Sequence, residues 1–250
     1  MSTRPHALVT GGARRVGREI ALELARAGCD VTITYAQNKA DADATCRDLA
    51  AIGAHAVAIQ LHLGDPTEVE DWANRIAGDF AHLDVLVHNA SVYGPSPIET
   101  MTGERALHDF RVNALGPLIL SGRLAPLLAR SRLPGGGAIV AMLDMHVLGR
   151  PRRGFSSYAM SKAALAEMVR SLARELGPGV RVNGIAPGVV EWPEQGEEST
   201  EPGQRAYLAR VPLGRAGTSQ DAAKAVRWLA MEATYVTGEI VRVDGGRWLA

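Results

Sequence analysis

The sequence is poor in cysteine, in aromatic residues and in any excess of charge of one sign. Its 250 residues include two cysteines, Cys29 and Cys46, and neither lies in a His/Cys spacing typical of a metal site. We therefore expect no disulfide framework and no structural metal, and a reducing, cytoplasmic compartment. The 27 basic and 27 acidic residues cancel. No global field favours nucleic acid or an anionic membrane surface as a partner.

Long hydrophobic runs are also missing. No apolar run reaches the ~18–20 residues that a membrane-spanning helix needs, although hydrophobic residues make up 46% of the chain. The first strand is expected at 6–10, which leaves no room for a signal peptide before it. This composition predicts a substantial hydrophobic core and no membrane segment.

What the sequence does contain is a regular alternation of strand and helix patterns. Strands are predicted at 6–10, 30–35, 55–61, 83–89, 137–143, 180–187 and 239–244, and helices at 15–27, 39–52, 66–79, 104–130, 156–176 and 219–231. Several strand runs are continuously apolar, as in strands that helices cover on both faces. The βαβ order predicts one α/β domain over 1–250, with a doubly wound parallel sheet and right-handed crossovers.

One segment, 191–204, differs in composition from the rest. It carries five glutamates, two prolines and two glycines. More helix and strand follow it, so we interpret the wider region 189–212 as a substrate loop or lid within the domain rather than a linker.

The turn after the first strand, TGGARRVG, suits a dinucleotide. Gly11 and Gly17 lie between a strand and a helix, where the backbone can approach a pyrophosphate that rests on the helix N-terminus. An ordinary tight turn is the alternative, and the strand-before, helix-after placement argues against it. Arg15 takes the middle position, where glycine is familiar, and Arg14 precedes it.

The end of the second strand favours NADPH over NADH. An acid that would hold the ribose hydroxyls of NADH is missing, and Tyr35, Gln37 and Asn38 stand in that region. With Arg14 in the neighbouring turn, a 2′-phosphate would be accepted rather than repelled.

Tyr158 and Lys162 lie four residues apart on a predicted helix and share a face. An ammonium group beside a phenol favours the phenolate, so we expect Lys162 to lower the pKa of Tyr158 and to make it a proton donor near neutral pH. Asp144 stands where a hydrophobic strand ends. A carboxylate is a poor partner for a carbonyl oxygen, because both accept hydrogen bonds. It suits N–H donors, which points to a C=N bond in a heterocycle.

Together with Asn113 in RVNALGP and with HNA at 88–90, this pattern resembles the short-chain dehydrogenase/reductase family over essentially the whole chain. The resemblance implies a Rossmann-type sheet of seven strands and a homotetramer. It also implies that Tyr158 is the proton donor, that Lys162 binds the nicotinamide ribose, and that Asn113 holds a water in the proton relay. Within the family, TGGARRVG, NASVY, VDGGRWL and an aspartate in place of the usual serine are similar to pteridine reductases and bacterial dihydromonapterin/dihydrofolate reductases.

The resemblance also implies specific site residues. The cofactor site would comprise Gly11, Arg14, Arg15, Val16, Gly17, Tyr35, Gln37, Asn38, Leu63, Asn89, Ala90, Ser91, Lys162, Pro187, Gly188 and Val189. The substrate site would comprise Arg15, Ser91, Tyr93, Asp144 and Tyr158, and the catalytic residues would be Asp144, Tyr158, Lys162 and Asn113. Trp192, at the start of the lid, is a further candidate for the substrate site, and packing within the lid is its alternative role. In the subgroup, the aromatic residue that matches Tyr93 stacks the pterin against the nicotinamide.

Three departures from the subgroup pattern stand out. Asp144 precedes Tyr158 by fourteen residues, one more than usual. His62 replaces an acid that contacts adenine in the family, and Gln37 and Asn38 replace an arginine and a serine of parasitic pteridine reductases.

The expected function is NADPH-dependent reduction of a dihydropterin, such as dihydromonapterin or dihydrobiopterin, with dihydrofolate as a weaker substrate. One alternative is a carbonyl reductase, such as a 3-oxoacyl carrier protein reductase, in which Ser156 or Ser157 takes over part of the missing serine's role. A cofactor-binding regulator without turnover is a third. The basic cluster Arg150, Arg152 and Arg153 is interpreted as a solvated loop rather than a site for an anionic substrate tail.

Overall fold

A parallel sheet runs through the centre of the computed structural model, which describes residues 4–194 and 196–250. Within these residues seven strands pair in the order β3-β2-β1-β4-β5-β6-β7, and every neighbouring pair is parallel. The strands are β1 (His6–Val9), β2 (Asp30–Tyr35), β3 (Ala56–Gln60), β4 (Val85–His88), β5 (Gly137–Met142), β6 (Val180–Pro187) and β7 (Ile240–Val243). The predicted α/β fold with a Rossmann-type, doubly wound sheet is confirmed.

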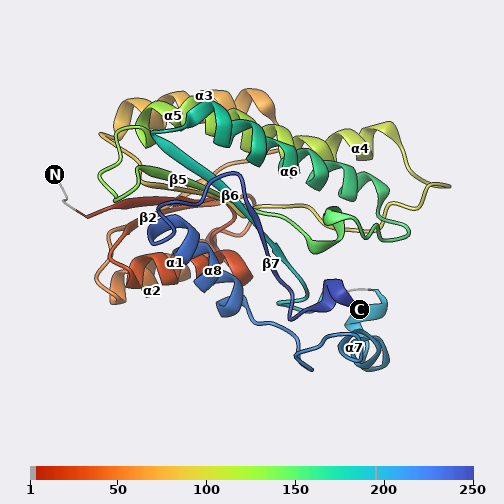
Figure 1. Ribbon diagram of the computed structural model, residues 1–250. Coiled ribbons are helices and arrows are strands. Elements are labelled where there is room, and N and C mark those ends of the chain that lie inside the picture. Colours follow the sequence, from red (N-terminus) through yellow and green to blue (C-terminus); the bar gives the residue numbers. More distant parts are fainter. Residues whose placement is uncertain (1–3, 195) are drawn as a thin grey trace.

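Helices cover both faces of this sheet (Figure 1). One face carries α1 (Arg15–Arg26), α2 (Lys39–Ala51) and α8 (Ser219–Met231). The other carries α3 (Pro66–Asp79), α4 (Gly103–Phe110), α5 (Gly116–Leu128) and α6 (Ser156–Leu176). No helix in the described part of the chain is long and apolar enough to cross a bilayer.

Two hydrophobic clusters fill the space between the sheet and its helices. In α1, Ile20 and Leu24 lie four apart on one face and pack, with α8, against the first side of the sheet. Leu124 of α5 and Val169 of α6 pack on the second side. The interior strand β5 is buried along its whole length, which is why its sequence is continuously apolar rather than alternating.

The single helix predicted over 104–130 is wrong. A π-helical segment, Arg111–Leu115, separates α4 from α5, and the N–H of Gly116 donates to the carbonyl of Arg111. Pro117 follows and has no N–H, so it cannot donate to the carbonyl of Asn113 as an α-helical residue would. The wide turn and the proline together leave that carbonyl without its α-helical partner.

The predicted lid also contains more helix than a loop. A short 3₁₀ turn at Glu197–Ser199 leads into α7 (Glu201–Leu208). Thr200 caps α7 by accepting the N–H of Gly203. α7 lies beyond the carboxyl end of β6, below the sheet in Figure 1, and its buried Tyr207 accepts the N–H of Val189 at 2.9 Å.

Candidate active site

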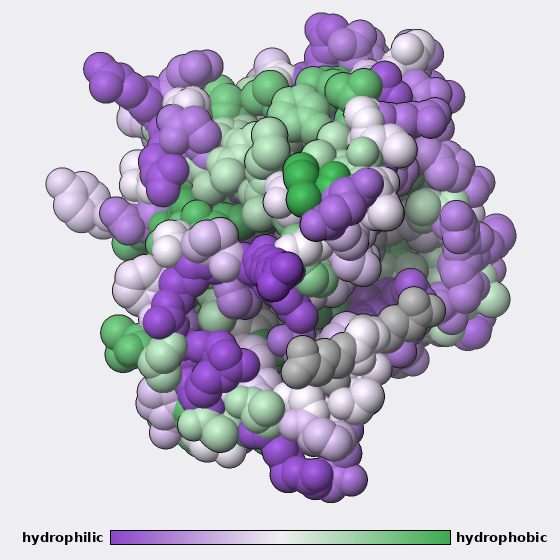
Figure 2. Space-filling model, turned by 90° about the vertical axis from the view of Figure 1, so that its right-hand side faces the viewer, coloured by the Kyte–Doolittle hydropathy of each residue, from purple (hydrophilic) through white to green (hydrophobic). Residues whose placement is uncertain are grey.

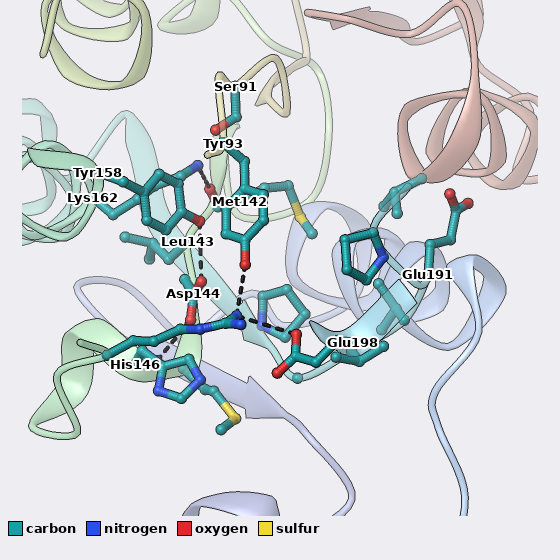
Figure 3. Close-up of a pocket in the computed structure, with 18 of the residues that line it drawn as sticks. Ser91, Tyr93, Met142, Leu143, Asp144, His146, Tyr158, Lys162, Glu191 and Glu198 are labelled. Atoms are coloured by element: carbon teal, nitrogen blue, oxygen red, sulfur yellow. Dashed lines mark hydrogen bonds and ion pairs between the residues drawn. The ribbon is translucent and has the colours of Figure 1, made fainter. Parts of the chain in front are cut away.

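A cavity of about 320 Å³ opens at the carboxyl ends of β4, β5 and β6, under the lid (Figure 3). Its walls come from four regions distant in sequence. The lining residues are Arg15, Val16, Asn89, Ser91, Tyr93, Met142, Leu143, Asp144, Met145, His146, Arg152, Tyr158, Lys162, Pro187, Gly188, Val189, Val190, Glu191, Pro193, Glu198 and Tyr207. The carboxyl edge of a parallel sheet is where ligands bind in this architecture, and the cavity brings together most of the side chains predicted for substrate and chemistry.

Asp144 and Tyr158 meet in this cavity, as Figure 3 shows. The Tyr158 hydroxyl donates to Oδ2 of Asp144 at 3.1 Å. The other carboxylate oxygen, Oδ1, accepts the N–H of His146 at 2.7 Å, so Asp144 caps the 3₁₀ helix Met145–Leu148. One oxygen therefore fixes the side chain, and the other faces the phenol. The extra residue before Tyr158 does not separate the two groups.

The pKa of Tyr158 moves opposite to the expectation. Burial raises it well above its ordinary value of 10, and the charge and hydrogen bond of Asp144 raise it further. Lys162 is not among the causes. The expected lowering of the tyrosine pKa by Lys162 is thus wrong for this arrangement, because desolvation and the adjacent carboxylate both disfavour the phenolate. Tyr158 stays a phenol at neutral pH.

Lys162 lies one helical turn from Tyr158 and is 3% exposed. Its Nζ donates to the carbonyl of Met142, at the end of β5, at 2.8 Å. Burial lowers the pKa of Lys162 to about 8, and the charge of Asp144 opposes this shift. The ammonium form therefore coexists with the neutral amine close to physiological pH.

Asn113 is buried behind this pair, and its side chain is fully engaged. Its Oδ1 accepts from the Ser91 hydroxyl at 3.0 Å and from the N–H of Val92 at 2.9 Å. Its Nδ2 donates to the Val92 carbonyl and to the hydroxyl of Ser161. The amide therefore ties the loop after β4 to α6. The Asn113 group still free of an α-helical partner is its main-chain carbonyl.

Aromatic rings form one wall. Tyr93 stacks on Phe155, with ring centroids 5.2 Å apart and planes inclined by 26°. It also meets Tyr158 edge-on at 5.0 Å. Tyr93 is 47% exposed, so one side of the ring is open to a flat ligand. Phe155 was not predicted, because a lone phenylalanine before a helix carries no distinguishing signal.

The glycine turn fits a bound pyrophosphate. Gly11 has φ +63°, a conformation that favours glycine. A Cβ at Gly17 would lie 2.2 Å from the Gly11 carbonyl and 2.5 Å from Nδ2 of Asn89. That Nδ2 donates to the Thr10 and Gly11 carbonyls. The Cβ of Ala90 lies against Gly11. α1 starts here with no side-chain cap, so its first N–H groups remain available to an anion.

The end of β2 adjoins this turn, since the N–H of Gly12 donates to the carbonyl of Thr34 at 3.0 Å. Arg14 is exposed and makes no ion pair within residues 4–194 and 196–250. Asn38 differs from expectation: its side chain caps α2 through the N–H of Asp41 and donates to the Asp41 carboxylate. Lys39 pairs with Asp43. Among the cations of this turn, Arg14 is therefore the one without a counter-ion in the described part of the chain.

Other predicted cofactor positions lie outside the cavity, along the path from the turn to β3. Tyr35 ends β2, Gln37 follows it, and Leu63 lies after β3, packed near Gly116. A dinucleotide that crosses the sheet edge would have its adenosine half over these residues.

Arg15 has a left-handed backbone, with φ +53°, at the position where glycine is familiar. Its Nε pairs with Glu191 at 2.7 Å, and its guanidinium also reaches the Trp192 carbonyl and Glu194. The hydroxyl of Ser219 binds the other oxygen of Glu191. The side chain thus connects the glycine turn to the start of the lid.

Arg152 and Glu198 line the cavity, and sequence reasoning missed both. Arg152 Nη1 donates to Oη of Tyr93 at 2.7 Å and pairs with Glu198 at 3.1 Å. Its guanidinium lies 4.4 Å from the centre of the Phe155 ring. The interpretation of 150–153 as a solvated loop is therefore wrong for Arg152. A glutamate-rich segment and an arginine-rich loop were visible, but not their pairing.

The residues of two other predictions lie outside the cavity lining. Trp192 does not line the cavity; its ring packs edge-on against Tyr207, with centroids 5.6 Å apart. Ser157 is buried and donates to Asp109 at 2.6 Å, away from the cavity, and Ser156 is exposed outside it.

A phosphate-binding turn beside a tyrosine and lysine at the carboxyl edge of a parallel sheet defines a nucleotide-dependent oxidoreductase of the Rossmann class. A family model described as enoyl-(acyl carrier protein) reductase matches residues 11–247. The 3-oxoacyl-[acyl-carrier-protein] reductase FabG of Staphylococcus aureus is 32% identical over 252 residues, all of both chains. An uncharacterized oxidoreductase of Methylorubrum extorquens is 34% identical over 244 residues, 96% of each chain.

Solved structures agree. A short chain dehydrogenase from Burkholderia cenocepacia in complex with NADP has a TM-score of 0.87 and 33% identity over 97% of each chain. A blue fluorescent protein from a metagenomic library, in complex with NADPH, has a TM-score of 0.86 and 32% identity over the same shares. The chain belongs to the short-chain dehydrogenase/reductase family.

Proposed function

We propose that the protein is an NADPH-dependent reductase of a nitrogen heterocycle of the dihydropterin type, such as dihydromonapterin or dihydrobiopterin. The observation that carries the proposal is the carboxylate of Asp144, hydrogen-bonded to Tyr158 where a carbonyl reductase needs a donor. Dihydrofolate is the weaker substrate within this proposal.

The cofactor assignment rests on the turn and on the relatives. The glycine turn leads into α1, which begins without a side-chain cap, so its first N–H groups can bind a pyrophosphate, and Arg14 is free to bind a 2′-phosphate. Structural relatives at 32–33% identity hold NADPH or NADP. Bound NADPH supplies the hydride. In this proposal Lys162 would hold the nicotinamide ribose, and Pro187 and Gly188 would contact the nicotinamide.

Proton delivery in this proposal runs through Tyr158. In a dihydropterin the hydride goes to C6 of the C6=N5 bond, and N5 takes the proton from the phenol oxygen of Tyr158. A ring nitrogen is a stronger base than a carbonyl oxygen, so it suits a phenol whose pKa is raised. The carboxylate of Asp144 accepts N–H groups of the ring. In this proposal the main-chain carbonyl of Asn113, which has no α-helical N–H partner because Pro117 follows, would hold a water that restores the proton.

A carbonyl substrate would find no second donor beside Tyr158. The residue thirteen positions before the tyrosine is Met145, which is buried in the cavity wall. Ser157 donates to Asp109, and Ser156 does not line the cavity. Neither serine of the carbonyl-reductase alternative has its hydroxyl beside Tyr158 in this arrangement, which supports the proposed heterocycle. Asp144 would repel the lone pairs of a carbonyl oxygen.

The second candidate is 3-oxoacyl thioester reduction, and the curated relatives favour it. FabG of S. aureus aligns over the whole chain, and the matching family model also carries an acyl carrier protein reductase name. The names of the relatives thus indicate a 3-oxoacyl thioester, whereas the residues of the site indicate a dihydropterin. An assay with both substrates distinguishes these two functions.

The deciding experiment measures NADPH oxidation by purified protein with dihydromonapterin, dihydrobiopterin, dihydrofolate and a short 3-oxoacyl thioester. We expect turnover of the pterins, a loss of about 100-fold in Asp144→Ala, and a loss of at least that size in Tyr158→Phe. Asp144→Ser should lose pterin turnover and gain thioester turnover. Turnover of the thioester alone by the wild type would overturn the pterin assignment and leave the family intact.

Ser156→Ala is the matched control, because Ser156 is exposed, begins the helix that carries Tyr158 and Lys162, and does not line the cavity. It should change neither activity. Retention of full biological activity by Tyr158→Phe would instead support a non-catalytic regulator.

The proposed assembly is a homotetramer in the cytoplasm. The face turned to the viewer in Figure 2 gathers apolar side chains in its upper part. Exposed apolar residues on α4, α5 and α6 include Leu107, Phe110, Leu118 and Met160. Such a patch indicates a protein interface, and sedimentation of the purified protein tests it. The two described cysteines are free thiols, in keeping with a reducing compartment.

A further inference from the structure

The cavity lining is balanced in charge. Its lysine and arginine side chains are Arg15, Arg152 and Lys162, and its carboxylates are Asp144, Glu191 and Glu198. Each arginine is paired with a carboxylate of the lid: Arg15 with Glu191 and Arg152 with Glu198. A ligand with a charged side chain would therefore enter a site whose charges are already satisfied.

Arg152 is held in place on several sides. Its guanidinium stacks on Phe155, donates to Oη of Tyr93, and pairs with Glu198. The Glu198 side chain is 17% exposed and that of Arg152 is 29% exposed, so water screens this pair less than a surface pair. Figure 3 shows dashed lines that join Tyr93 and Glu198 to the same guanidinium group.

The geometry leaves neutral hydrogen-bonding groups at the cavity rim. Because Tyr93 Oη accepts from Arg152, its own proton is free to be donated. Glu198 has a second carboxylate oxygen that can accept. A hydroxylated, uncharged side chain satisfies both groups, whereas an anionic one meets the carboxylate of Glu198 at close range.

We propose that Arg152 and Glu198 form a charge-compensated subsite that selects substrates with an uncharged, hydroxylated side chain over those with an anionic side chain. This inference rests on the proposed pterin reduction and names its specificity-determining residues. Glu198 is the excluding group. Arg152 is the group that would bind an anion once Glu198 is neutralised.

The test compares dihydrofolate, whose side chain carries two carboxylates, with its dimethyl ester, which has nearly the same size and no charge. The measured quantity is the ratio of kcat/KM for the ester to that for the acid, in wild type, Glu198→Gln and Arg152→Gln. In Glu198→Gln the ratio should fall about tenfold, because Arg152 gains the acid as its counter-ion. In Arg152→Gln the ratio should rise, because Glu198 is left unpaired.

The double variant Glu198→Gln/Arg152→Gln should lose the gain of the first substitution. Glu201→Gln is the control, because it also replaces one glutamate by glutamine but lies on α7, outside the cavity lining. The Glu201 side chain is 80% exposed and pairs with Arg205. Its ratio should equal that of the wild type.

The outcomes separate the two proposals. If dihydrobiopterin is reduced and the ester-to-acid ratio is the same in all variants, the subsite is refuted and the pterin function stands. If no pterin is reduced or bound by the wild type, both fall. Dissociation constants for ester and acid, from quenching of tryptophan fluorescence, should follow the same order in any variant too slow to assay.

Discussion

The phenol oxygen of Tyr158 lies 3.1 Å from a carboxylate oxygen of Asp144, and its proton points at that oxygen. The two residues come from different elements, the end of β5 and the first turn of α6. A buried tyrosine beside an anion keeps its proton. The pair therefore presents a phenolic proton next to a carboxylate that can accept N–H groups. This combination is the chemical reason for proposing a nitrogen heterocycle as the substrate.

Asp144→Asn should lower the pKa of Tyr158, because it removes the negative charge and keeps an oxygen acceptor. The proton-donating phenol exists below this pKa, so the alkaline loss of kcat/KM should begin at lower pH in the variant. Loss of the same charge also lowers the pKa of Lys162 below about 8. This second shift also moves the alkaline loss of kcat/KM to lower pH.

Ultraviolet difference titration of tyrosinate measures the pKa of Tyr158 directly, when the spectrum of Tyr158→Phe is subtracted as the reference. Asp79→Asn, an exposed change on α3, should leave the titration unaltered. An unchanged midpoint in Asp144→Asn would show that Asp144 does not act on the phenol.

Arg14→Ala should raise the KM for NADPH about tenfold and leave the KM for NADH unchanged, since only NADPH carries the 2′-phosphate that this arginine is proposed to bind. Arg18→Ala is the control, because Arg18 already pairs with Glu19 and Asp48. Steady-state kinetics with both cofactors checks the result. Equal catalytic efficiency of the wild type with NADH and NADPH would contradict the assignment.

Arg181→Met should lower the free energy of unfolding by about 2–4 kcal/mol without changing the KM for NADPH. The buried guanidinium donates to the carbonyls of Leu229, Ala230 and Ala233 at the end of α8, at 2.6–3.0 Å. The variant leaves these carbonyls unsatisfied. Urea unfolding measures the loss, and Arg170→Met, at an exposed site, should cost less than about 0.5 kcal/mol.

His88 should make the protein sensitive to acid. Burial lowers the pKa of His88 from 6.5 to about 3, so the unfolded chain binds a proton at a pH where the folded chain does not. Stability is present above pH 6.5 and is lost as the pH falls toward 3. Between pH 7 and pH 5 the loss from this group is about 2 kcal/mol.

His88→Gln keeps a polar side-chain group that can hydrogen-bond Ser121, whose hydroxyl lies 2.8 Å from Nε2 of the histidine. Urea unfolding at pH 7 and pH 5 should show a smaller loss in His88→Gln than in the wild type. The exposed change His62→Gln should keep the full loss. Equal losses in His88→Gln and the wild type would rule out His88 as the acid-sensitive group.

The sheet and the meeting of Asp144 with Tyr158 were predictable from sequence, because parallel strands bring their carboxyl ends to one edge. Periodicity could not show the π segment at Asn113, since an amphipathic pattern continues across it. The direction of the Tyr158 pKa was also out of reach. Helical spacing places Lys162 near the phenol, but the shift depends on burial and on where Nζ points, which is to Met142.

Contacts across long sequence separations were the hardest to anticipate. Arg152 and Glu198 are 46 residues apart, and either charge alone reads as a solvated surface residue. Asn38 shows the reverse case: a residue expected at the cofactor is committed to capping α2. Local capping rules would have identified that role.

Arg15 has a left-handed backbone, and its side chain forms ion pairs with Glu191 and Glu194. A substitution that relieves the backbone strain also removes these ion pairs. Glycine at position 15 would relieve a torsional strain of about 1–2 kcal/mol, yet it would release the lid from the turn. Arg15→Gly should therefore yield a protein that unfolds at higher temperature and closes less firmly over its ligand. At this one residue, a change that raises thermal stability is expected to weaken retention of the substrate.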